Sequence, residues 1–378
     1  MRGPAVRSIV VAAGGTGGHL FPAEALAAEM LARGERVALM TDARSSAFDS
    51  AAFASAERFV LRGSGLSGRG PLRAAAGAAG LAAGTVQARA LLARLRAAAV
   101  VGFGGYPSVP PVLAALSMAG GARPATVLHE QNGVLGRANR FLSPRATALA
   151  LSFADTVGVP ASARAEVVGN PVRPALAALA GGGYPHADGG NGLRLLVLGG
   201  SLGARVFADV VPAAVAALPE GLRGRLLVAQ QCRPEDIARV REAYAGAGVP
   251  AQLSPFFPDV AGRLSTAHLV IARAGASTIA ELACAGRPSV LVPLPHAIDD
   301  HQSANARTLA AAGAAWIVRQ AEFTPALLAG RLSALLADPD ALAAAAAAAS
   351  RLGQPDAARR LADLVLSLVR PAAEQVQR

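Results

Sequence analysis

The sequence predicts an α/β protein with two Rossmann-like, doubly wound domains. An apolar run that ends in a glycine turn occurs twice, at residues 8–18 and at 193–203, and both turns have the form Gly-Gly-[Ser/Thr]-x-Gly. Such a turn joins a buried strand to a helix whose first N–H groups can approach an anion. The length of 378 residues also suits two domains of ordinary size. We therefore expect two such domains facing a shared cleft.

Short apolar runs alternate with alanine-rich helical stretches along the chain, which is typical of doubly wound folds. In the first half, strands are predicted at Ser8–Ala13, Val37–Met40, Ala99–Phe103, Ala125–His129, Ala148–Ser152 and Glu166–Val168. In the second half, they are predicted at Leu193–Leu198, Arg225–Ala229, Ala251–Leu253, Leu269–Ala272, Ser289–Val292 and Ala315–Val318. Two prolines in residues 169–174 close the first series. This places the boundary between a domain of residues 1–167 and one of residues 168–355.

The composition excludes several classes of protein. Although 53% of the residues are hydrophobic, no uncharged apolar run approaches the ~20 residues that span a bilayer. The first apolar run is too short for a signal peptide, so we expect a cytosolic chain. All 36 basic residues are arginine, which excludes a Walker A lysine and a Schiff-base lysine. Cys232 and Cys284 are too few for a disulfide framework.

The positive charge is concentrated in the N-terminal half. Residues 1–165 hold 17 arginines against 8 acidic residues, and no acidic residue lies between Glu57 and Glu130. That interval holds eight arginines, interleaved with Leu66, Leu72, Leu81, Val86, Leu91, Leu92 and Leu95. Such a surface favours docking on an anionic membrane, although arginine also serves simply to keep an alanine-rich protein in solution. Nucleic acid is not expected as a partner, because only 4% of the residues are aromatic and no nucleic-acid-binding motif is present.

Glycine-rich and polar segments follow several of the predicted strands. In open α/β sheets, ligands bind at the carboxyl ends of the strands. These segments are Gly14–His19, Gly102–Ser108, His129–Asn132, Arg273–Leu282 and Asp299–Ala306. In the fourth segment, small residues open a helix whose N–H groups suit a phosphate, and Glu281 can reach a diol one turn later. No Asp-x-Asp pair suited to Mg²⁺ is evident.

Taken together, these segments resemble the MurG family of bacterial glycosyltransferases. The matching motifs are GGTGGH at 14–19, GFGGYPS at 102–108, HEQN at 129–132, GNPVR at 169–173, GGSLGAR at 199–205, RAGASTIAEL at 273–282 and DDHQSANA at 299–306. They occur in order over nearly the whole chain. The resemblance implies the GT-B fold, with a C-terminal helix in residues 356–378 that crosses back onto the N-terminal domain.

The activity implied by this resemblance is inverting transfer of N-acetylglucosamine (GlcNAc) from UDP-GlcNAc. The acceptor is the C4 hydroxyl of N-acetylmuramic acid (MurNAc) in lipid I, and the product is lipid II, the precursor of peptidoglycan. No metal or other cofactor is expected. The expected location is peripheral, at the cytoplasmic face of the bacterial membrane, where other cell-wall synthesis proteins are possible partners.

The resemblance also assigns residues to the substrates. Gly200, Ser201, Ala276, Ser277 and Thr278 would hold the diphosphate, Glu281 the ribose and Phe257 the uracil. Thr16, Asn132, His301 and Gln302 would contact the sugar, and Arg173 would reach the donor. Gly17, Gly18, Gly104 and Gly105 are further substrate-binding positions, in the two glycine turns of the first half.

His19 is the best-placed histidine for the catalytic base. It stands at the start of the helix that follows the first glycine turn. An inverting transfer needs a base for the acceptor hydroxyl, which typically contributes ~10²–10⁴-fold in rate. The negative charge that builds on the leaving UDP would be met by helix-start N–H groups. The alternative is that His19 caps the helix or binds phosphate.

Other functions fit the sequence less well. An NAD-dependent oxidoreductase would use a glycine turn and Asp42, but position 20 lacks the third glycine and no hydride-transfer site is evident. A UDP-GlcNAc 2-epimerase shares the fold, yet it needs several carboxylates in the cleft and few are apparent. Another UDP-sugar-dependent GT-B enzyme remains an alternative. A non-catalytic membrane-binding module has no use for the glycine turns of the second domain.

Overall fold

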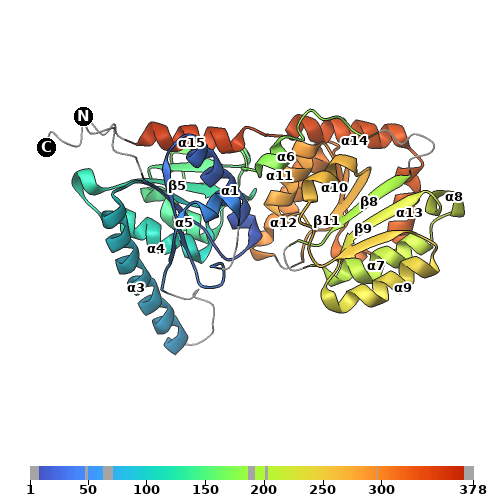
Figure 1. The fold of residues 1–378 in the computed structure, drawn as a ribbon, viewed down its shortest axis with the longest axis horizontal. Coiled ribbons are helices and arrows are strands. Elements are labelled where there is room, and N and C mark those ends of the chain that lie inside the picture. The colour runs from blue at the N-terminus through green and yellow to red at the C-terminus, as the bar shows by residue number, and fades with distance from the viewer. Residues whose placement is uncertain are drawn as a thin grey trace. The chain divides into compact units, whose positions relative to one another are not determined.

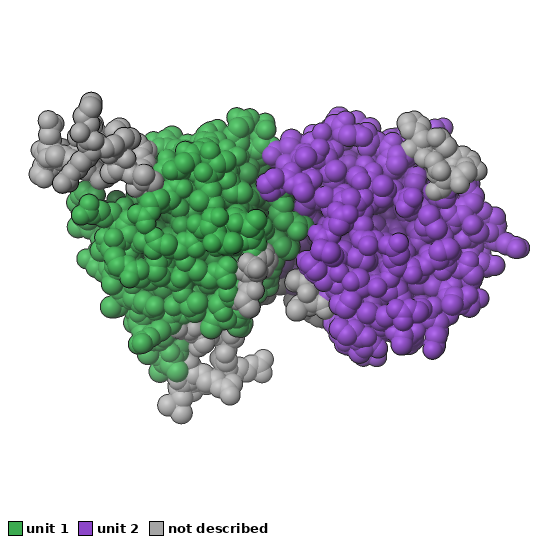
Figure 2. All heavy atoms as spheres, viewed as in Figure 1, with its two compact units in different colours: residues 1–173, 356–378 green, residues 174–355 purple. Residues whose placement is uncertain are grey.

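The computed structural model describes residues 8–46, 50–62, 71–185, 192–200, 203–295 and 297–369. The chain divides into two compact units, which Figure 2 shows in different colours. Unit 1 consists of residues 1–173 and 356–378, and unit 2 of residues 174–355. This division lies a few residues after the expected boundary at 167.

Unit 1 is built on a seven-stranded parallel sheet with the order β3-β2-β1-β4-β5-β6-β7. Figure 1 shows this sheet, with β5 labelled, among the helices of the unit. Its strands are β1 (Ser8–Ala12), β2 (Arg36–Thr41), β3 (Glu57–Val60), β4 (Ala97–Gly102), β5 (Ala125–Glu130), β6 (Ala148–Leu151) and β7 (Ala165–Val167). Its helices are α1 (Gly17–Ala32), α2 (Ala51–Ala54), α3 (Pro71–Leu95), α4 (Gly105–Leu116), α5 (Arg137–Leu142) and α15 (Ala357–Leu368), with short 3₁₀ turns η1 (Gly120–Ala122) and η2 (Ser143–Arg145). The strand order reverses between β1 and β4, the kind of position at which such sheets bind ligands.

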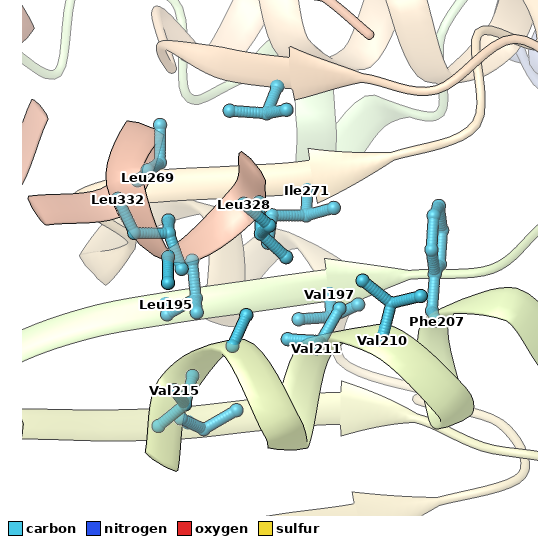
Figure 3. Close-up of a cluster of buried hydrophobic side chains, with 14 of the residues drawn as sticks. Leu195, Val197, Phe207, Val210, Val211, Val215, Leu269, Ile271, Leu328 and Leu332 are labelled. Atoms are coloured by element: carbon cyan, nitrogen blue, oxygen red, sulfur yellow. The ribbon is translucent and has the colours of Figure 1, made fainter. Parts of the chain in front are cut away.

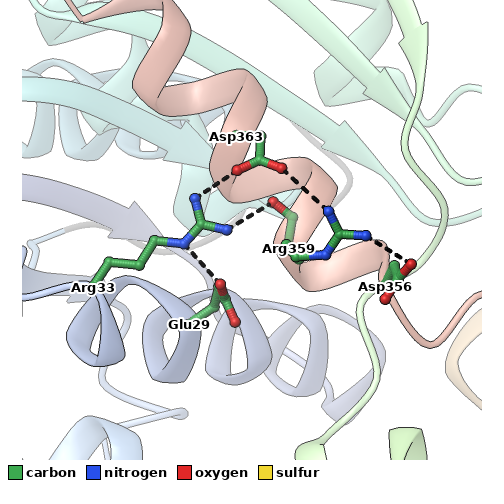
Figure 4. Close-up of polar contacts among 5 residues, drawn as sticks. All are labelled: Glu29, Arg33, Asp356, Arg359 and Asp363. Carbon is green, nitrogen blue, oxygen red and sulfur yellow. Dashed lines mark hydrogen bonds and ion pairs between the residues drawn. The ribbon is translucent and has the colours of Figure 1, made fainter.

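The last helix, α15, completes the core of unit 1. Leu361 and Val365 of α15 are fully buried in one cluster with Val11 of β1 and Leu26 of α1. At the surface of this packing, Arg33, the C-cap residue of α1, pairs with Asp363 of α15 (Figure 4). The C-terminal helix therefore packs on the N-terminal unit, which confirms that part of the predicted fold.

Unit 2 repeats the same architecture with six parallel strands in the order β10-β9-β8-β11-β12-β13. The strands are β8 (Leu193–Leu198), β9 (Leu226–Gln231), β10 (Ala251–Ser254), β11 (Leu269–Ala272), β12 (Ser289–Leu291) and β13 (Ala315–Ile317). The helices are α6 (Pro174–Ala177), α7 (Arg205–Ala216), α8 (Glu220–Arg223), α9 (Ile237–Gly246), α10 (Val260–Thr266), α11 (Ala276–Ala285), α12 (His301–Ala311), α13 (Pro325–Leu336) and α14 (Pro339–Leu352), with η3 (Pro234–Asp236), η4 (Ile298–Asp300) and η5 (Gln320–Glu322). Here the strand order reverses between β8 and β11.

The core of unit 2 explains why most of its strand sequences are largely apolar. Figure 3 shows Leu195 and Val197 of β8 packed with Val211 of α7 and Leu328 of α13. Because helices cover both faces of a parallel sheet, successive side chains on both faces are buried. All twelve predicted strands form, each within two residues of its expected ends. The α/β fold with two doubly wound sheets is therefore confirmed.

One strand, β3, was not predicted. It is four residues long and lies at the edge of the sheet in unit 1, where Glu57 and Val60 are exposed. An edge strand with outward-facing charge has no buried run to mark it in the sequence.

Within the described residues, no single helix is long and apolar enough to cross a membrane. By length and composition alone, Pro325–Leu336 and Pro339–Leu368 together would be long and apolar enough, but the pair is bent by 92°. Leu332 and Leu361 of this pair are buried in the cores of units 2 and 1.

Candidate active site

In unit 1, three predicted motifs meet at the carboxyl ends of β1, β4 and β5, which are neighbours in the sheet. The turn after β1 is tightly packed. A Cβ on Gly14 would lie 3.0 Å from side-chain atoms of Asp42 and Pro107. Gly15 has a φ of +87°, and its N–H donates to Ser45 Oγ at 2.6 Å. The first two glycines are therefore required by the turn itself, whatever it binds.

His19 lies in the first turn of α1, partly exposed, beside a second glycine turn. A Cβ on Gly105 would lie 3.3 Å from His19 Nε2, and one on Gly104 would lie 3.5 Å from His19 Cε1. Both glycines also have positive φ, +66° and +81°. The turn after β4 can therefore lie against the imidazole only because these two residues lack side chains.

His129 and Gln131, at the end of β5, connect His19 to the protein interior. Gln131 Oε1 lies 3.0 Å from His19 Nδ1, and Gln131 Nε2 lies 2.9 Å from His129 Nδ1. On its other side, His129 Nε2 lies 2.9 Å from the carbonyl oxygen of Gly169. Burial lowers the pKa of His129 to about 4, so this ring is neutral near pH 7.

Glu130 organises the loop that follows β5. Its Oε1 accepts from the backbone N–H and the side-chain amide of Asn132, at 3.1 and 3.0 Å. Its Oε2 accepts from Gly136 N–H and from the amide of Asn139, both at 2.9 Å. The buried carboxylate thus holds Asn132, a predicted sugar contact, in one conformation.

The other predicted residues of unit 1 surround the start of α1. Thr16 and Gly18 are exposed and Gly17 is partly exposed. The guanidinium carbon of Arg173 lies 4.5 Å from the ring centroid of Phe21 on α1. Arg173 also acts against the burial that raises the pKa of Glu24. The last residue of the GNPVR motif therefore packs on the helix that carries His19.

In unit 2, the second glycine turn follows β8. A Cβ on Gly199 would lie 2.5 Å from the backbone nitrogen of Ala204, and Gly200 has a φ of +79°. Ser201, predicted to hold the diphosphate, lies outside the described residues. The amide of Gln231 secures the turn, because Oε1 accepts from Gly199 N–H and Nε2 donates to the carbonyl of Gly200, both at 3.1 Å.

The segment after β11 starts a helix, as predicted. Gly275 is the N-cap residue and has no side chain to cap the helix, and α11 begins at Ala276. Ser277 and Thr278 are partly exposed in its first turn, while Glu281 is buried one turn further on. The first N–H groups of a helix carry partial positive charge and suit an anion. Because β11 and β8 are neighbours, this helix start lies beside the Gly199–Gly200 turn.

Arg273 places a buried cation just before that helix start. Its Nη1 donates to the carbonyls of Val292 and Pro293, and its Nη2 donates to Gln320 Oε1 at 2.6 Å. Burial lowers the pKa of this guanidinium. The cation adds positive potential at the carboxyl end of β11.

The remaining predicted donor residues lie in two loops. The ring of Phe257 is only 4% exposed, with the guanidinium carbon of Arg263 3.9 Å from its centroid, whereas Phe256 is 59% exposed. Gln302 Oε1 accepts from Leu294 N–H at 2.9 Å, and His301 is the first residue of α12. The roles of Phe257, His301 and Gln302 toward a donor remain predictions.

The loop before α12 also has an unusual backbone. Asp299 and Asp300 have positive φ, +53° and +50°, which is uncommon for residues other than glycine. Such conformations occur often at functional sites.

Among the described residues, no group of three or more His, Cys, Asp or Glu side chains is arranged to hold a metal ion. The two cysteines of the chain, Cys232 and Cys284, are buried free thiols, and burial raises the pKa of each to about 11.

Comparison with known proteins agrees with these motifs. The family profile of the glycosyltransferase family 28 N-terminal domain matches residues 9–151, and that of the family 28 C-terminal domain matches residues 194–361. A protein of Granulibacter bethesdensis, named UDP-N-acetylglucosamine--N-acetylmuramyl-(pentapeptide) pyrophosphoryl-undecaprenol N-acetylglucosamine transferase, is 59% identical over 96% of this chain and 94% of its own length. A protein of the same name from Acidiphilium cryptum is 55% identical over the full length of both chains.

Among solved structures, that of Acinetobacter baumannii MurG is similar. It covers 96% of this chain and 99% of its own, with 30% identity and a TM-score of 0.75. The chain therefore belongs to glycosyltransferase family 28, within the MurG family that its motifs resemble.

Proposed function

We infer that this protein transfers GlcNAc from UDP-GlcNAc to the C4 hydroxyl of MurNAc in lipid I, which gives lipid II for peptidoglycan synthesis. The observation that carries this function is 59% identity over 96% of the chain to a transferase named for these substrates. The fold alone would not decide it, because doubly wound domains host many reactions.

Unit 2 is the proposed donor-binding unit. Its two glycine-containing turns lie at neighbouring strands, β8 and β11, where the strand order reverses. Backbone N–H groups of the Gly199–Gly200 turn and of the first turn of α11 suit a diphosphate. Glu281, one turn into α11, is the proposed partner of the ribose hydroxyls.

Unit 1 is the proposed acceptor-binding unit, with His19 as the base. The C4 oxygen of MurNAc bonds to the anomeric carbon as the bond from that carbon to the β-phosphate oxygen breaks. The hydroxyl proton passes to His19, and the electron pair of the broken bond leaves with UDP. Asn132, which is held by Glu130, is a proposed contact to the sugar.

We propose that transfer needs no metal ion. The charge that develops on the leaving UDP would be stabilised by the N–H groups at the start of α11, together with the positive potential of Arg273. This proposal is supported by the buried position of Arg273, three residues before α11 begins. A loss of turnover in the presence of EDTA, restored by Mg²⁺, would contradict it.

We also propose that unit 1 docks peripherally on an anionic membrane, at the cytoplasmic face where UDP-sugars are found. Arg89 and Arg94 of α3 and the adjacent Arg96 are exposed, and Val86 on the same helix is 69% exposed. The buried Leu92 and Leu95 pack in the core of unit 1 and are not available to a bilayer, contrary to the expectation from sequence. Leu66 lies outside the described residues. Docking therefore depends more on charge than on apolar insertion.

Incubation with UDP-GlcNAc and a lipid I analogue tests the proposed reaction. UDP release that requires the acceptor, together with a β-linked disaccharide product, is the expected result. Conversion of UDP-GlcNAc to UDP-ManNAc without acceptor would instead identify an epimerase. Binding of UDP without any turnover would contradict both the transferase and the epimerase assignment.

A further inference from the structure

A chain of hydrogen bonds in unit 1 ends at His19. It runs from the carbonyl of Gly169 through His129 and Gln131 to His19, with contacts of 2.9, 2.9 and 3.0 Å. His129 is fully buried and Gln131 is 1% exposed. Where water is excluded, each donor must face an acceptor, so the protons along this chain can be assigned.

The carbonyl of Gly169 determines the tautomer of His129. A carbonyl oxygen only accepts hydrogen bonds, so His129 Nε2 carries a hydrogen and donates it. Burial keeps the ring neutral by lowering its pKa to about 4. His129 Nδ1 therefore has a lone pair and acts as an acceptor.

Two acceptors then determine the orientation of the Gln131 amide. Gln131 Nε2 lies 2.9 Å from His129 Nδ1 and 3.0 Å from the carbonyl oxygen of His129. In the reversed orientation, Oε1 would face both of these acceptors, and the two hydrogens on Nε2 would point away from them. The orientation with Nε2 toward His129 is therefore fixed, and Oε1 faces His19.

We propose that Gln131 and His129 are positioning residues that hold neutral His19 as its Nδ1–H tautomer. Since Gln131 Oε1 accepts only, His19 Nδ1 must donate, which leaves the lone pair on Nε2. This inference rests on the proposed role of His19 as the base. It identifies Nε2 as the atom that takes the proton of the acceptor hydroxyl.

The surroundings of Nε2 agree with that assignment. In the part of the chain that the structure describes, Nε2 has no hydrogen-bond partner. In the turn after β4, a Cβ on Gly105 would lie 3.3 Å from Nε2. Glycine at this position leaves room on the side of the ring that carries the lone pair.

Nitrogen NMR of the full-length protein labelled with ¹⁵N-histidine tests the assignment directly, without substrate. The six histidines are separated by assigning His19 from a His19→Asn variant. We expect a protonated Nδ1 and an unprotonated Nε2 for the neutral ring of His19. In Gln131→Leu, we expect the Nε2–H form to appear and kcat for transfer to fall at least about tenfold, with KM for UDP-GlcNAc changed by less than about twofold.

Two further variants separate proton placement from packing. Gln131→Glu keeps an acceptor oxygen toward His19, and its second oxygen must carry a proton to donate toward His129 in place of Nε2. His19 should then remain Nδ1–H, and kcat should exceed that of Gln131→Leu. If Gln131 served only to fill space, the apolar leucine would be tolerated better than a buried carboxylate, and the order would reverse. Gln230→Leu is the matched control, because it removes another buried amide, which accepts from Tyr244 OH at 2.6 Å in unit 2.

The proposed positioning of His19 by Gln131 and His129 is overturned if His19 of the unaltered protein carries its hydrogen on Nε2. It is also overturned if Gln131→Leu changes neither the tautomer nor kcat. A tautomer change without a fall in kcat would overturn its importance for the reaction. These outcomes are distinct from failure of the proposed function, which would appear as absence of acceptor-dependent UDP release in the unaltered protein.

Discussion

Arg33 at the C-cap of α1 and Asp363 of α15, 330 positions apart in the sequence, form an ion pair with a distance of 2.6 Å between Nη1 and Oδ1. Arg33 also donates to Glu29 Oε1 at 2.7 Å and to the carbonyl of Arg359 (Figure 4). These contacts lie at the edge of the packing between the first and the last helix of unit 1.

The ion pair should contribute little to stability compared with the apolar packing beneath it. Asp363→Ala is expected to lower the free energy of unfolding of unit 1 by at most about 1 kcal/mol, because half-exposed ion pairs are screened by water. Leu361→Ala, at a fully buried position, should cost about 2–5 kcal/mol. Urea unfolding of the two variants measures both effects, and a larger loss for Asp363→Ala would contradict this account.

Removal of the proposed base should affect turnover much more than donor binding. His19→Ala is expected to reduce kcat by about 10²-fold or more, the usual contribution of a positioned base. Its affinity for UDP should stay within about twofold, because the proposed UDP site belongs to unit 2. Acceptor-dependent UDP release and calorimetric UDP titration give the two values, and near-normal turnover would exclude His19 as the base.

Substitution of the glycine beside His19 should impair the reaction for a reason other than backbone strain. Gly105→Ala combines a positive φ with a Cβ 3.3 Å from His19 Nε2. Gly120→Ala is the matched control in unit 1, since Gly120 has a similar φ of +60° and open space around its Cβ position.

Both alanine variants of these glycines should lose about 1–2 kcal/mol of stability. Only Gly105→Ala should lower kcat/KM for the acceptor, by about tenfold or more. Steady-state kinetics and thermal unfolding compare the two, and equal kinetics in both variants would show that the contact with His19 is unimportant.

Membrane docking should depend on salt and on the arginines at the end of α3. Binding to vesicles that contain anionic lipid is expected to weaken steeply as salt is added. Arg94→Gln combined with Arg96→Gln should weaken it about tenfold or more, at about 1 kcal/mol for each arginine. Arg241→Gln with Arg351→Gln makes the same charge change at exposed positions of unit 2 and should have a small effect. Salt-independent sedimentation with vesicles would argue for apolar insertion instead.

The lowered pKa of His129 predicts that the protein loses stability at acid pH. Burial lowers its pKa from 6.5 to about 4, so above pH ~6.5 the ring is neutral in both the folded and the unfolded chain. Between pH ~6.5 and ~4, the unfolded chain binds a proton that the folded protein does not. The free energy of unfolding should therefore fall over this interval by up to about 3 kcal/mol.

The His129→Phe variant serves as the control for that pH dependence. Its ring can pack near Phe103, whose centroid lies 5.4 Å from that of His129, but it has no proton to bind. Chemical unfolding at a series of pH values should give a shallower slope for the variant. An unchanged slope would assign the acid sensitivity to other groups.

Most of the fold could be predicted from sequence because the strands are buried on both faces. Leu195–Leu198 and Leu269–Ala272 are uninterrupted apolar runs, and the strands that contain them form as predicted. β3 could not be predicted, because its edge position leaves Glu57 and Val60 exposed. Leu92 and Leu95 were expected at the membrane surface, but their spacing of three residues along α3 places both on the face that packs in the core.

The site was predictable only in its motifs, and the connections between motifs required the strand order. His19 and Gln131 are 112 positions apart, and they meet because β1, β4 and β5 are consecutive in the sheet. Gln231, which fixes the second glycine turn, follows in the same way from the pairing of β8 with β9. The polar residues His129 to Gln131 at the end of a buried strand were the one signal in the sequence for such a support.

The contribution of α15 to the core of unit 1 also sets an order for folding during synthesis. Residues 174–355 leave the ribosome as one uninterrupted stretch, so unit 2 has all of its strands and helices before the chain is finished. Unit 1, although translated first, lacks Leu361 and Val365 until the last helix emerges. Although unit 1 is translated first, its core is thus completed after that of unit 2. Its apolar surface stays exposed while unit 2 is being translated.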